Sequence, residues 1–141
     1  MSKYVFDIET NGLFPDKVWM LVMQDCATEE VYSYSDYDSD LPSIKEGLAR
    51  LSKAKIIAGH NIISFDLPVM KKLLNWEPSE GTRVWDTFIM SQLCKYQRGH
   101  MHGLKGWGGF FDYPKGDHED WSCYSKEMLE YCIRDVDLNL K

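Results

Sequence analysis

Long apolar runs, paired cysteines and an excess of positive charge are all missing from this sequence of 141 residues. No apolar stretch approaches the roughly 20 residues that a membrane-spanning helix requires. No basic segment followed by an apolar signal region precedes the strand-forming stretch that begins at Tyr4. We therefore expect a cytoplasmic protein with no membrane partner.

The cysteine pattern of a zinc site is missing as well. The four cysteines, at positions 26, 94, 123 and 132, are scattered, and no Cys-x-x-Cys pair or histidine spacing suits zinc. We interpret them as reduced thiols. The net charge of −6 argues against a protein that coats nucleic acids through a general basic surface. It leaves open an enzyme whose acidic site is filled by metal ions.

What is present is enough apolar material for one folded core. Hydrophobic residues make up 44% of the chain and aromatic residues 13%, which argues against disorder. The length predicts a single domain over residues 1–141. No internal repeat, linker or low-complexity tract interrupts it.

The stretch Tyr4–Thr10 carries two acids in a strand-forming context, and a turn signal at Asn11-Gly12 ends it. Side chains alternate along a strand, so Asp7 and Glu9 point to the same face. Two such carboxylates repel each other, and a hard divalent cation relieves this repulsion. For a lone Asp-x-Glu pair an edge strand with a solvated acidic face is the favoured interpretation, so residues further along the chain must decide.

Periodicity predicts an α/β fold. Three stretches predict the strands of an antiparallel meander: residues 4–10, 17–26 and 30–34. A helix follows, with Ser43 as its N-cap and Glu46 at the spacing of a capping box. Residues 55–59 predict a short strand parallel to the first, because a helix separates the two.

The second half of the chain predicts one more strand and further helices. Val84–Trp85 forms the last strand, and Asp86 caps the next helix rather than taking part in chemistry. Residues 96–120 are rich in loop signals, with a short helix expected around 104–108. The final helix begins near Ser125 and continues to the C-terminus.

Three more polar residues are candidates for the site. Asp66 lies where a strand passes into a helix, at the sheet edge where open α/β sheets place their sites. A plain helix cap explains Asp66 as well as function does. Tyr131 and Asp135 share one helix stripe at i, i+4 spacing, and a solvated helix flank remains an alternative for both.

Taken in order, these motifs resemble the DEDD superfamily of 3′–5′ exonucleases, in its tyrosine-bearing (DEDDy) branch. The resemblance is carried by three stretches: Phe6–Leu13, His60–Asp66 and Tyr131–Asp135. The chain looks closest to the exonuclease domain of bacteriophage family A DNA polymerases, through four further stretches: Val84–Thr87, His102–Gly108, Lys115–Trp121 and Glu127–Cys132. No polymerase palm or fingers follows, and only six residues follow Asp135.

The resemblance implies a ribonuclease-H-like fold, with a five-stranded mixed sheet flanked by helices. It also implies that two Mg²⁺ or Mn²⁺ ions are held by four acids: Asp7, Glu9, Asp66 and Asp135. Such a pair, roughly 4 Å apart, clamps the attacking and leaving oxygens of a phosphodiester. Tyr131 would orient the attacking water, since a tyrosine with its usual pKa near ~10 stays protonated at neutral pH.

The implied substrate is the 3′ end of a DNA strand, single-stranded, in a proofreading-like reaction. Four residues would contact it: Thr10, Leu13, Asn61 and Phe65. For Asn61, capping of a turn is an equally good explanation. A polymerase or replication protein is the expected partner, in the host cytoplasm if the protein is encoded by a phage. An exoribonuclease of the same fold and a non-catalytic nucleic-acid-binding module are the alternatives, although the intact set of acids argues against the module.

Overall fold

The computed structural model describes residues 3–12, 15–94 and 126–140. Five strands form one mixed sheet in the order β3-β2-β1-β4-β5. Their bounds are β1 Lys3–Thr10, β2 Val18–Asp25, β3 Val31–Tyr34, β4 Ile56–Gly59 and β5 Arg83–Asp86. β1, β2 and β3 pair antiparallel, whereas β4 and β5 are parallel to β1. The predicted ribonuclease-H-like sheet is therefore confirmed, with a last strand longer than Val84–Trp85.

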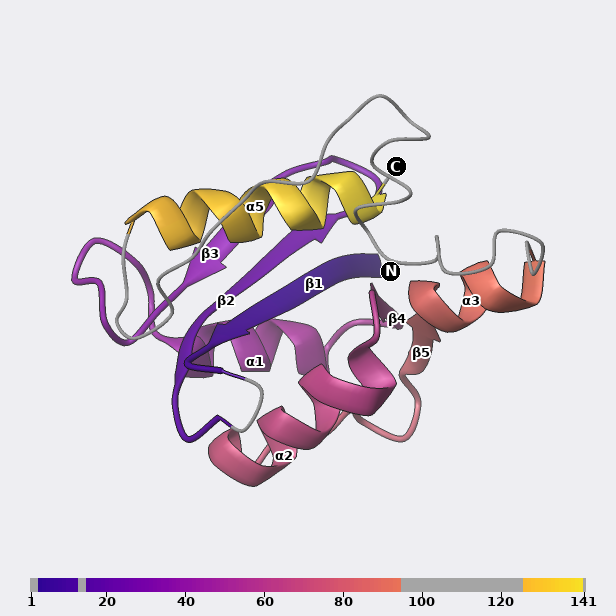
Figure 1. Cartoon of the computed structure of the whole chain (residues 1–141), viewed down its shortest axis with the longest axis horizontal. Helices are drawn as coiled ribbons and strands as arrows, with labels where there is room; N and C mark the ends of the chain where they lie inside the picture. The colour runs from indigo at the N-terminus through magenta and orange to yellow at the C-terminus, as the bar shows by residue number, and fades with distance from the viewer. Residues whose placement is uncertain (1–2, 13–14, 95–125, 141) are drawn as a thin grey trace.

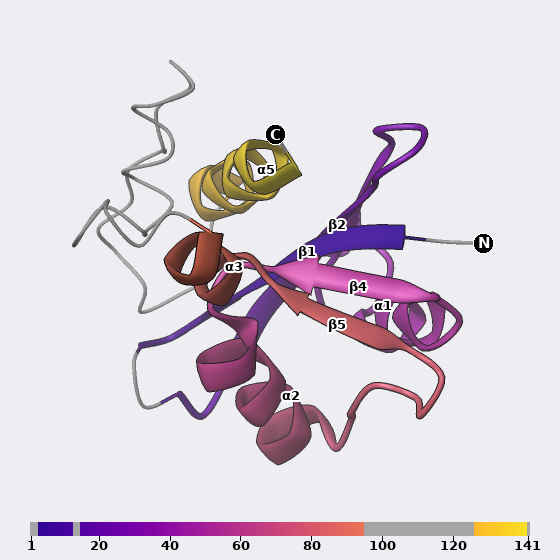
Figure 2. The same ribbon diagram turned by 90° about the vertical axis from the view of Figure 1, so that its right-hand side faces the viewer.

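The helices cover both faces of the sheet (Figures 1 and 2). Helices α1 (Ile44–Ser52) and α2 (Leu67–Leu74) lie on one face, and α5 (Lys126–Leu140) lies on the other. Helix α3 (Thr87–Cys94) follows directly from β5 at the end of the sheet. None of the helices in the described ranges is long and apolar enough to cross a membrane.

Strand β1 is central because it is apolar on both faces. Tyr4, Phe6 and Ile8 belong to the core cluster beneath α1 and α2. Val5 belongs to the second cluster, which α5 closes with Met128, Cys132 and Val136, so the helix stripe predicted from the sequence is confirmed. Burial on both faces removes the alternative in which Asp7 and Glu9 lie on a solvated edge strand.

Two local predictions need correction. Ser43 occupies the N-cap position of α1, but its side chain makes no capping hydrogen bond. Asp36 supplies the bond instead, since its carboxylate accepts the Ile44 N–H at 3.1 Å. Between β4 and α2 the chain forms a π-helical turn, η1 (Ile62–Asp66), where the sequence predicts direct entry into an α-helix. The short helix expected around 104–108 lies outside the described residues.

Candidate functional site

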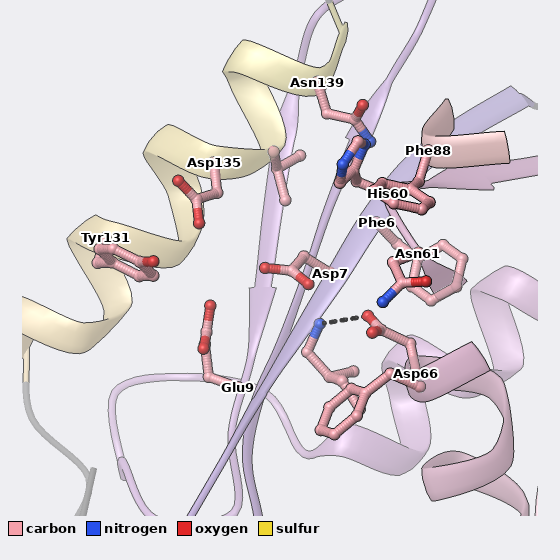
Figure 3. A pocket seen from close by; sticks show the side chains of 13 residues that line it. Phe6, Asp7, Glu9, His60, Asn61, Asp66, Phe88, Tyr131, Asp135 and Asn139 are labelled. Atoms are coloured by element: carbon pink, nitrogen blue, oxygen red, sulfur yellow. Dashed lines mark hydrogen bonds between the residues drawn. The ribbon is translucent and has the colours of Figure 1, made fainter. Parts of the chain in front are cut away.

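A pocket of about 400 Å³ opens at the carboxyl end of β1, beneath α5 (Figure 3). It is bordered by β1, the β4–η1 turn, the start of α3 and α5. The lining residues are Phe6, Asp7, Ile8, Glu9, His60, Asn61, Phe65, Asp66, Phe88, Tyr131, Asp135, Val136 and Asn139. Four carboxylates and a tyrosine hydroxyl therefore meet in one cavity, and none of the described lining residues is a lysine or an arginine.

Asp66 reaches the pocket because β1 extends beyond its neighbour. The parallel pairing of β1 with β4 ends at Val5↔Ala58, so the later N–H groups on that side of β1 have no strand partner. The Asp66 carboxylate accepts the Ile8 N–H at 3.3 Å and continues the edge of the sheet. Its side chain makes no capping bond to α2, which excludes the plain helix-cap alternative.

The turn that carries Asp66 depends on a close approach at Gly59. A Cβ at this position would lie 2.3 Å from Ile62 Cγ2 and 2.9 Å from the Phe6 carbonyl oxygen, so a larger residue would push η1 away from β1. Asn61 enters the turn with a left-handed φ of 60°, a conformation that asparagine tolerates better than most residues. The sequence Gly-His-Asn thus folds the chain back over the end of β1.

Asp86 holds the same turn from β5. Its carboxylate accepts the N–H groups of Asn61 at 2.8 Å and Ile63 at 3.0 Å. It also accepts those of Phe88 at 2.9 Å and Ile89 at 3.4 Å, at the start of α3. The predicted capping role of Asp86 is confirmed. Asp86 also accepts hydrogen bonds from the η1 turn, which the sequence did not predict, and these bonds position Asp66.

The carboxylates are crowded. Burial raises the pKa of Glu9 well above its usual value, and the neighbouring Asp7 raises it further through its charge and a hydrogen bond. Burial and Asp7 raise the pKa of Asp66 in the same way. Both effects disfavour the charged forms, so several negative charges together in this pocket are costly without a cation.

Helix α5 supplies the opposite wall. Tyr131, Asp135 and Asn139 follow one another at intervals of four residues and all line the pocket, whereas Met128 and Cys132 pack into the core. The ring of Tyr131 lies beside Glu9 and Asp135, with its hydroxyl toward the acids (Figure 3). The placement of Tyr131 and Asp135 in the cavity excludes a wholly solvated helix flank.

The donor set fits a hard divalent cation. One carboxylate oxygen of Asp7, one of Glu9 and Cys132 Sγ lie within 4.8 Å of one another. Cys132 Sγ lies 3.7 Å from Asp7 Oδ2, and burial raises the pKa of this thiol well above its usual value, so it stays a neutral S–H donor. The ligands that remain are carboxylate oxygens, which Mg²⁺ and Mn²⁺ prefer.

The structure brings seven of the nine predicted site residues into this pocket: Asp7, Glu9, Asn61, Phe65, Asp66, Tyr131 and Asp135. Thr10 is not among the lining residues, and its hydroxyl donates to the Gly12 carbonyl at 2.9 Å within the turn. Leu13 lies outside the described residues. Four polar or aromatic lining residues were not predicted as site residues: Phe6, His60, Phe88 and Asn139. The sequence could have indicated Asn139 as a lining residue, because it stands one helical turn after Asp135.

Comparison with known proteins places the chain in a family. A model of the RNase_H superfamily matches residues 4–106, and the chain therefore belongs to that superfamily. A search of curated proteins found no match.

Many solved structures share the fold, among them a nuclease and a DNA polymerase. One is described as the apo form of a nuclease, with a TM-score of 0.72, 23% identity, and coverage of 98% of this chain and 67% of that chain. The other is the family B DNA polymerase from the hyperthermophilic archaeon Pyrobaculum calidifontis, with a TM-score of 0.73, 15% identity, and coverage of 99% of this chain and 24% of that chain. This chain thus corresponds to only part of the polymerase.

Proposed function

We propose that the protein is a metal-dependent nuclease that removes nucleotides from the 3′ end of single-stranded DNA. The observation that carries the proposal is the convergence of four carboxylates and Tyr131 on one pocket at the carboxyl end of β1. Membership of the RNase_H superfamily and the fold shared with a nuclease support it. The 3′–5′ direction rests on the resemblance of the ordered motifs to the tyrosine-bearing exonucleases.

The acids would hold two Mg²⁺ or Mn²⁺ ions through Asp7, Glu9, Asp66 and Asp135. When bound, such ions lower the pKa of water and neutralise charge on the scissile phosphate. Tyr131 offers a hydroxyl on the same side of the pocket as Glu9 and Asp135, where it can hydrogen-bond a water molecule and orient it (Figure 3). The Ile8 N–H fixes Asp66, so this ligand is oriented before a cation binds.

The wall opposite α5 suits the terminal nucleotide. Phe65 and Phe88 present aromatic surface to the cavity, and Asn61 and His60 provide hydrogen-bonding groups. Bases of single strands stack on aromatic side chains irrespective of their sequence. His60 is held in place, because its Nδ1 lies 2.9 Å from Thr87 Oγ1 and its ring packs edge-on against Phe88 at 5.3 Å. A polymerase or another replication protein is the partner that we propose for such a domain.

One assay tests the proposal. The chain is incubated with 5′-labelled single-stranded DNA, the matching RNA and a duplex with a mismatched 3′ end, in Mg²⁺, Mn²⁺ or EDTA. We expect a ladder that shortens from the 3′ end of the DNA in either metal, no reaction in EDTA, and slower digestion when the 3′ terminus is blocked.

Other outcomes of this assay contradict parts of the proposal. Faster digestion of RNA than of DNA would favour an exoribonuclease. Cleavage of circular single-stranded DNA would contradict the exonuclease direction. Binding of DNA without cleavage in either metal would favour a non-catalytic module.

A further inference from the structure

A second pocket, of about 560 Å³, lies on the other face of the sheet from the acids. It is formed between α1 and the antiparallel strands, with Tyr4, Tyr32 and Tyr34 on the sheet side and Glu46, Arg50 and Lys53 on the helix side. Tyr4 stands near the start of β1 and belongs to the core cluster beneath α1, whereas Asp7 and Glu9 face α5 near the end of the strand.

Arg50 is held rigidly in the second pocket by tyrosines. Its Nε donates to the Tyr34 hydroxyl at 3.0 Å, and its guanidinium carbon lies 4.0 Å from the centre of the Tyr32 ring. A hydrogen bond to the Tyr4 hydroxyl is the largest of the effects that raise the pKa of Arg50 above its usual value. The guanidinium is therefore always charged and is oriented before any ligand arrives.

The charge of Arg50 has no carboxylate partner among the described residues. Glu46 lines the same pocket but forms no ion pair with Arg50. Glu30 accepts the Tyr32 hydroxyl at 2.9 Å instead. Lys53, three residues after Arg50, adds a second cation, so the lining carries two positive charges and one negative charge. The lining is thus locally positive in a chain of net charge −6, which favours an anion over a cation in this pocket.

We propose that this pocket binds the phosphate group of a phosphomonoester such as a nucleoside monophosphate, with the phosphate on Arg50 and Lys53. The planar fork of arginine matches a phosphate through two parallel hydrogen bonds. The tyrosine rings position Arg50 rather than the ligand, because Tyr4 and Tyr34 are each only 5% exposed and the guanidinium covers Tyr32. The volume is within the range of small-molecule pockets, roughly 300–1,000 Å³. The proposal does not rest on the nuclease activity, since the ligand is either a free mononucleotide or the end of a strand.

Binding is measured by titration calorimetry on the full chain in EDTA, which keeps metal out of the acidic pocket. The probes are deoxyadenosine monophosphate, deoxyadenosine and inorganic phosphate. We expect saturable binding of the monophosphate with one site per chain, and binding at least about tenfold weaker for deoxyadenosine, which lacks the phosphate. Inorganic phosphate should compete with the monophosphate for the same site.

Substitutions test whether the ligand binds at Arg50 and Lys53. Arg50→Lys keeps the charge but loses the planar fork, and we expect it to weaken binding by at least about tenfold. Lys53→Gln should weaken binding by roughly threefold to tenfold, the effect of an exposed charge. Lys72→Gln, the same change at an exposed position on α2, should have no effect. Asp7→Asn should bind like the wild type, which separates this site from the acidic pocket.

A structural role of the arginine–tyrosine cluster, fastening α1 to β3, makes different predictions. No saturable binding, equal binding by Arg50→Lys, or loss of binding in Asp7→Asn would each overturn the proposal. If Arg50→Lys does not fold, amide chemical shifts of the wild type decide. Changes at Ala49 and Lys53 would support the pocket, and changes confined to Asp7 and Asp66 would refute it.

A final titration distinguishes the two sources of the ligand, a free mononucleotide and the end of a strand. A short single-stranded oligonucleotide that binds more tightly than the monophosphate assigns the pocket to a strand end, and weaker binding assigns it to the free nucleotide. Either result supports the pocket if Arg50→Lys weakens both ligands.

Discussion

The backbone N–H of Ile8 donates to the carboxylate of Asp66 at 3.3 Å, across 58 positions of the sequence. This bond exists because the pairing of β1 with β4 ends at Val5↔Ala58 and leaves the end of β1 without a strand on that side. Asp66 takes the place of the missing strand. The same contact that completes the edge of the sheet also directs a carboxylate into the acidic pocket.

Asp66→Asn separates this structural contact from metal binding. The amide oxygen can still accept the Ile8 N–H, and the loss of a negative charge beside Asp7 relieves repulsion. We expect the metal-free variant to melt at the wild-type temperature or above it. Saturating Mg²⁺ should stabilise the wild type by about 2.7 kcal/mol at a hundredfold excess over Kd, and the variant much less. Glu80→Gln, at an exposed position, is the control. An undiminished metal shift in Asp66→Asn would remove Asp66 from the site.

The raised pKa values of Glu9 and Asp66 predict how stability depends on pH. The folded state binds protons at these acids that the unfolded state releases, so without metal the free energy of unfolding should rise as the pH falls from 7 towards about 5. The slope is at most about 1.4 kcal/mol per pH unit for each proton. Mg²⁺ should abolish the effect because it requires the charged carboxylates.

Urea unfolding at pH 5, 6 and 7, in EDTA and in Mg²⁺, measures this dependence. Glu9→Gln should show a smaller slope than the wild type. If the free energy of unfolding of the metal-free wild type instead fell steadily as the pH was lowered from 7 to 5, the raised pKa values of Glu9 and Asp66 would be contradicted.

Tyr131→Phe keeps the ring and the helix and removes only the hydroxyl. Turnover should fall by roughly tenfold to a thousandfold, the scale of one oriented hydrogen bond in a site. The Mg²⁺-induced melting shift should survive, because no metal ligand has changed. Tyr37→Phe, at a tyrosine that is 50% exposed, is the matched control and should leave turnover unchanged. Single-turnover rates of both variants are compared, and full activity in Tyr131→Phe would exclude the water-orienting role.

Asp86→Ala tests the support of the η1 turn. Four backbone N–H groups lose their acceptor, and we expect the free energy of unfolding to fall by about 2–4 kcal/mol. Asp36→Ala removes one helix-capping bond and should cost about 1 kcal/mol. Denaturant unfolding in EDTA compares the two. An equal loss in both variants would mean that Asp86 acts only as an ordinary cap.

Local periodicity predicted much of this fold from the sequence. The alternation in β1 placed Asp7 and Glu9 on one face, and the stripe of α5 placed Cys132 in the core and Tyr131 with Asp135 beside it. Both predictions depend on neighbours within one element, where the period of a strand or helix decides which side chains share a face.

Contacts between distant segments were beyond this kind of reasoning. Ser43 has the right residue type and spacing for a cap, yet Asp36 from the preceding loop makes the bond. Asp86 looked like a local cap, and its bonds to Asn61 and Ile63 depend on the pairing of β4 with β5. In the same way, His60 enters the pocket because Thr87, 27 positions away, holds its ring.

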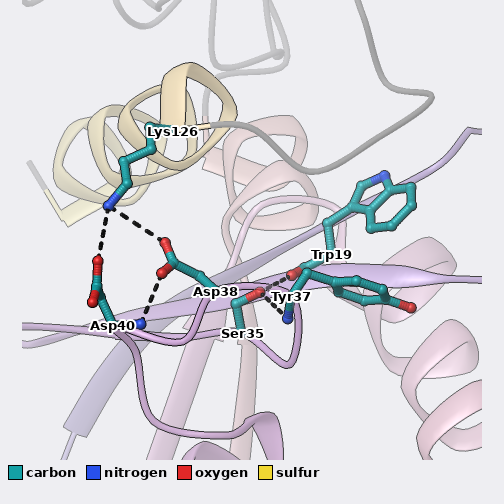
Figure 4. A network of polar contacts seen from close by, with 6 residues as sticks. All are labelled: Trp19, Ser35, Tyr37, Asp38, Asp40 and Lys126. Carbon is teal, nitrogen blue, oxygen red and sulfur yellow. Dashed lines mark hydrogen bonds and ion pairs between the residues drawn. The ribbon is translucent and has the colours of Figure 1, made fainter.

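A fourth network of this kind ties the start of α5 to the loop after β3 (Figure 4). Lys126, at the start of α5, lies 3.6 Å from Asp38 Oδ2 and 3.7 Å from Asp40 Oδ2. Ser35 fastens the same loop to β2, because its hydroxyl donates to the Trp19 carbonyl at 2.6 Å. These bonds join segments that no local pattern relates.

Two aspartates on one helix provide the most direct test of the central claim, that the acids around the end of β1 form a metal-dependent nuclease site. Asp135 is buried in the pocket, whereas Asp137, two residues later, accepts a hydrogen bond from Gln24 Nε2 at 3.3 Å outside it. The measurement is the single-turnover rate on 5′-labelled single-stranded DNA in Mn²⁺ for Asp135→Asn and Asp137→Asn. We predict a loss of at least about a hundredfold in the first and less than about threefold in the second. Wild-type cleavage by Asp135→Asn, or equal losses in both variants, would contradict the account.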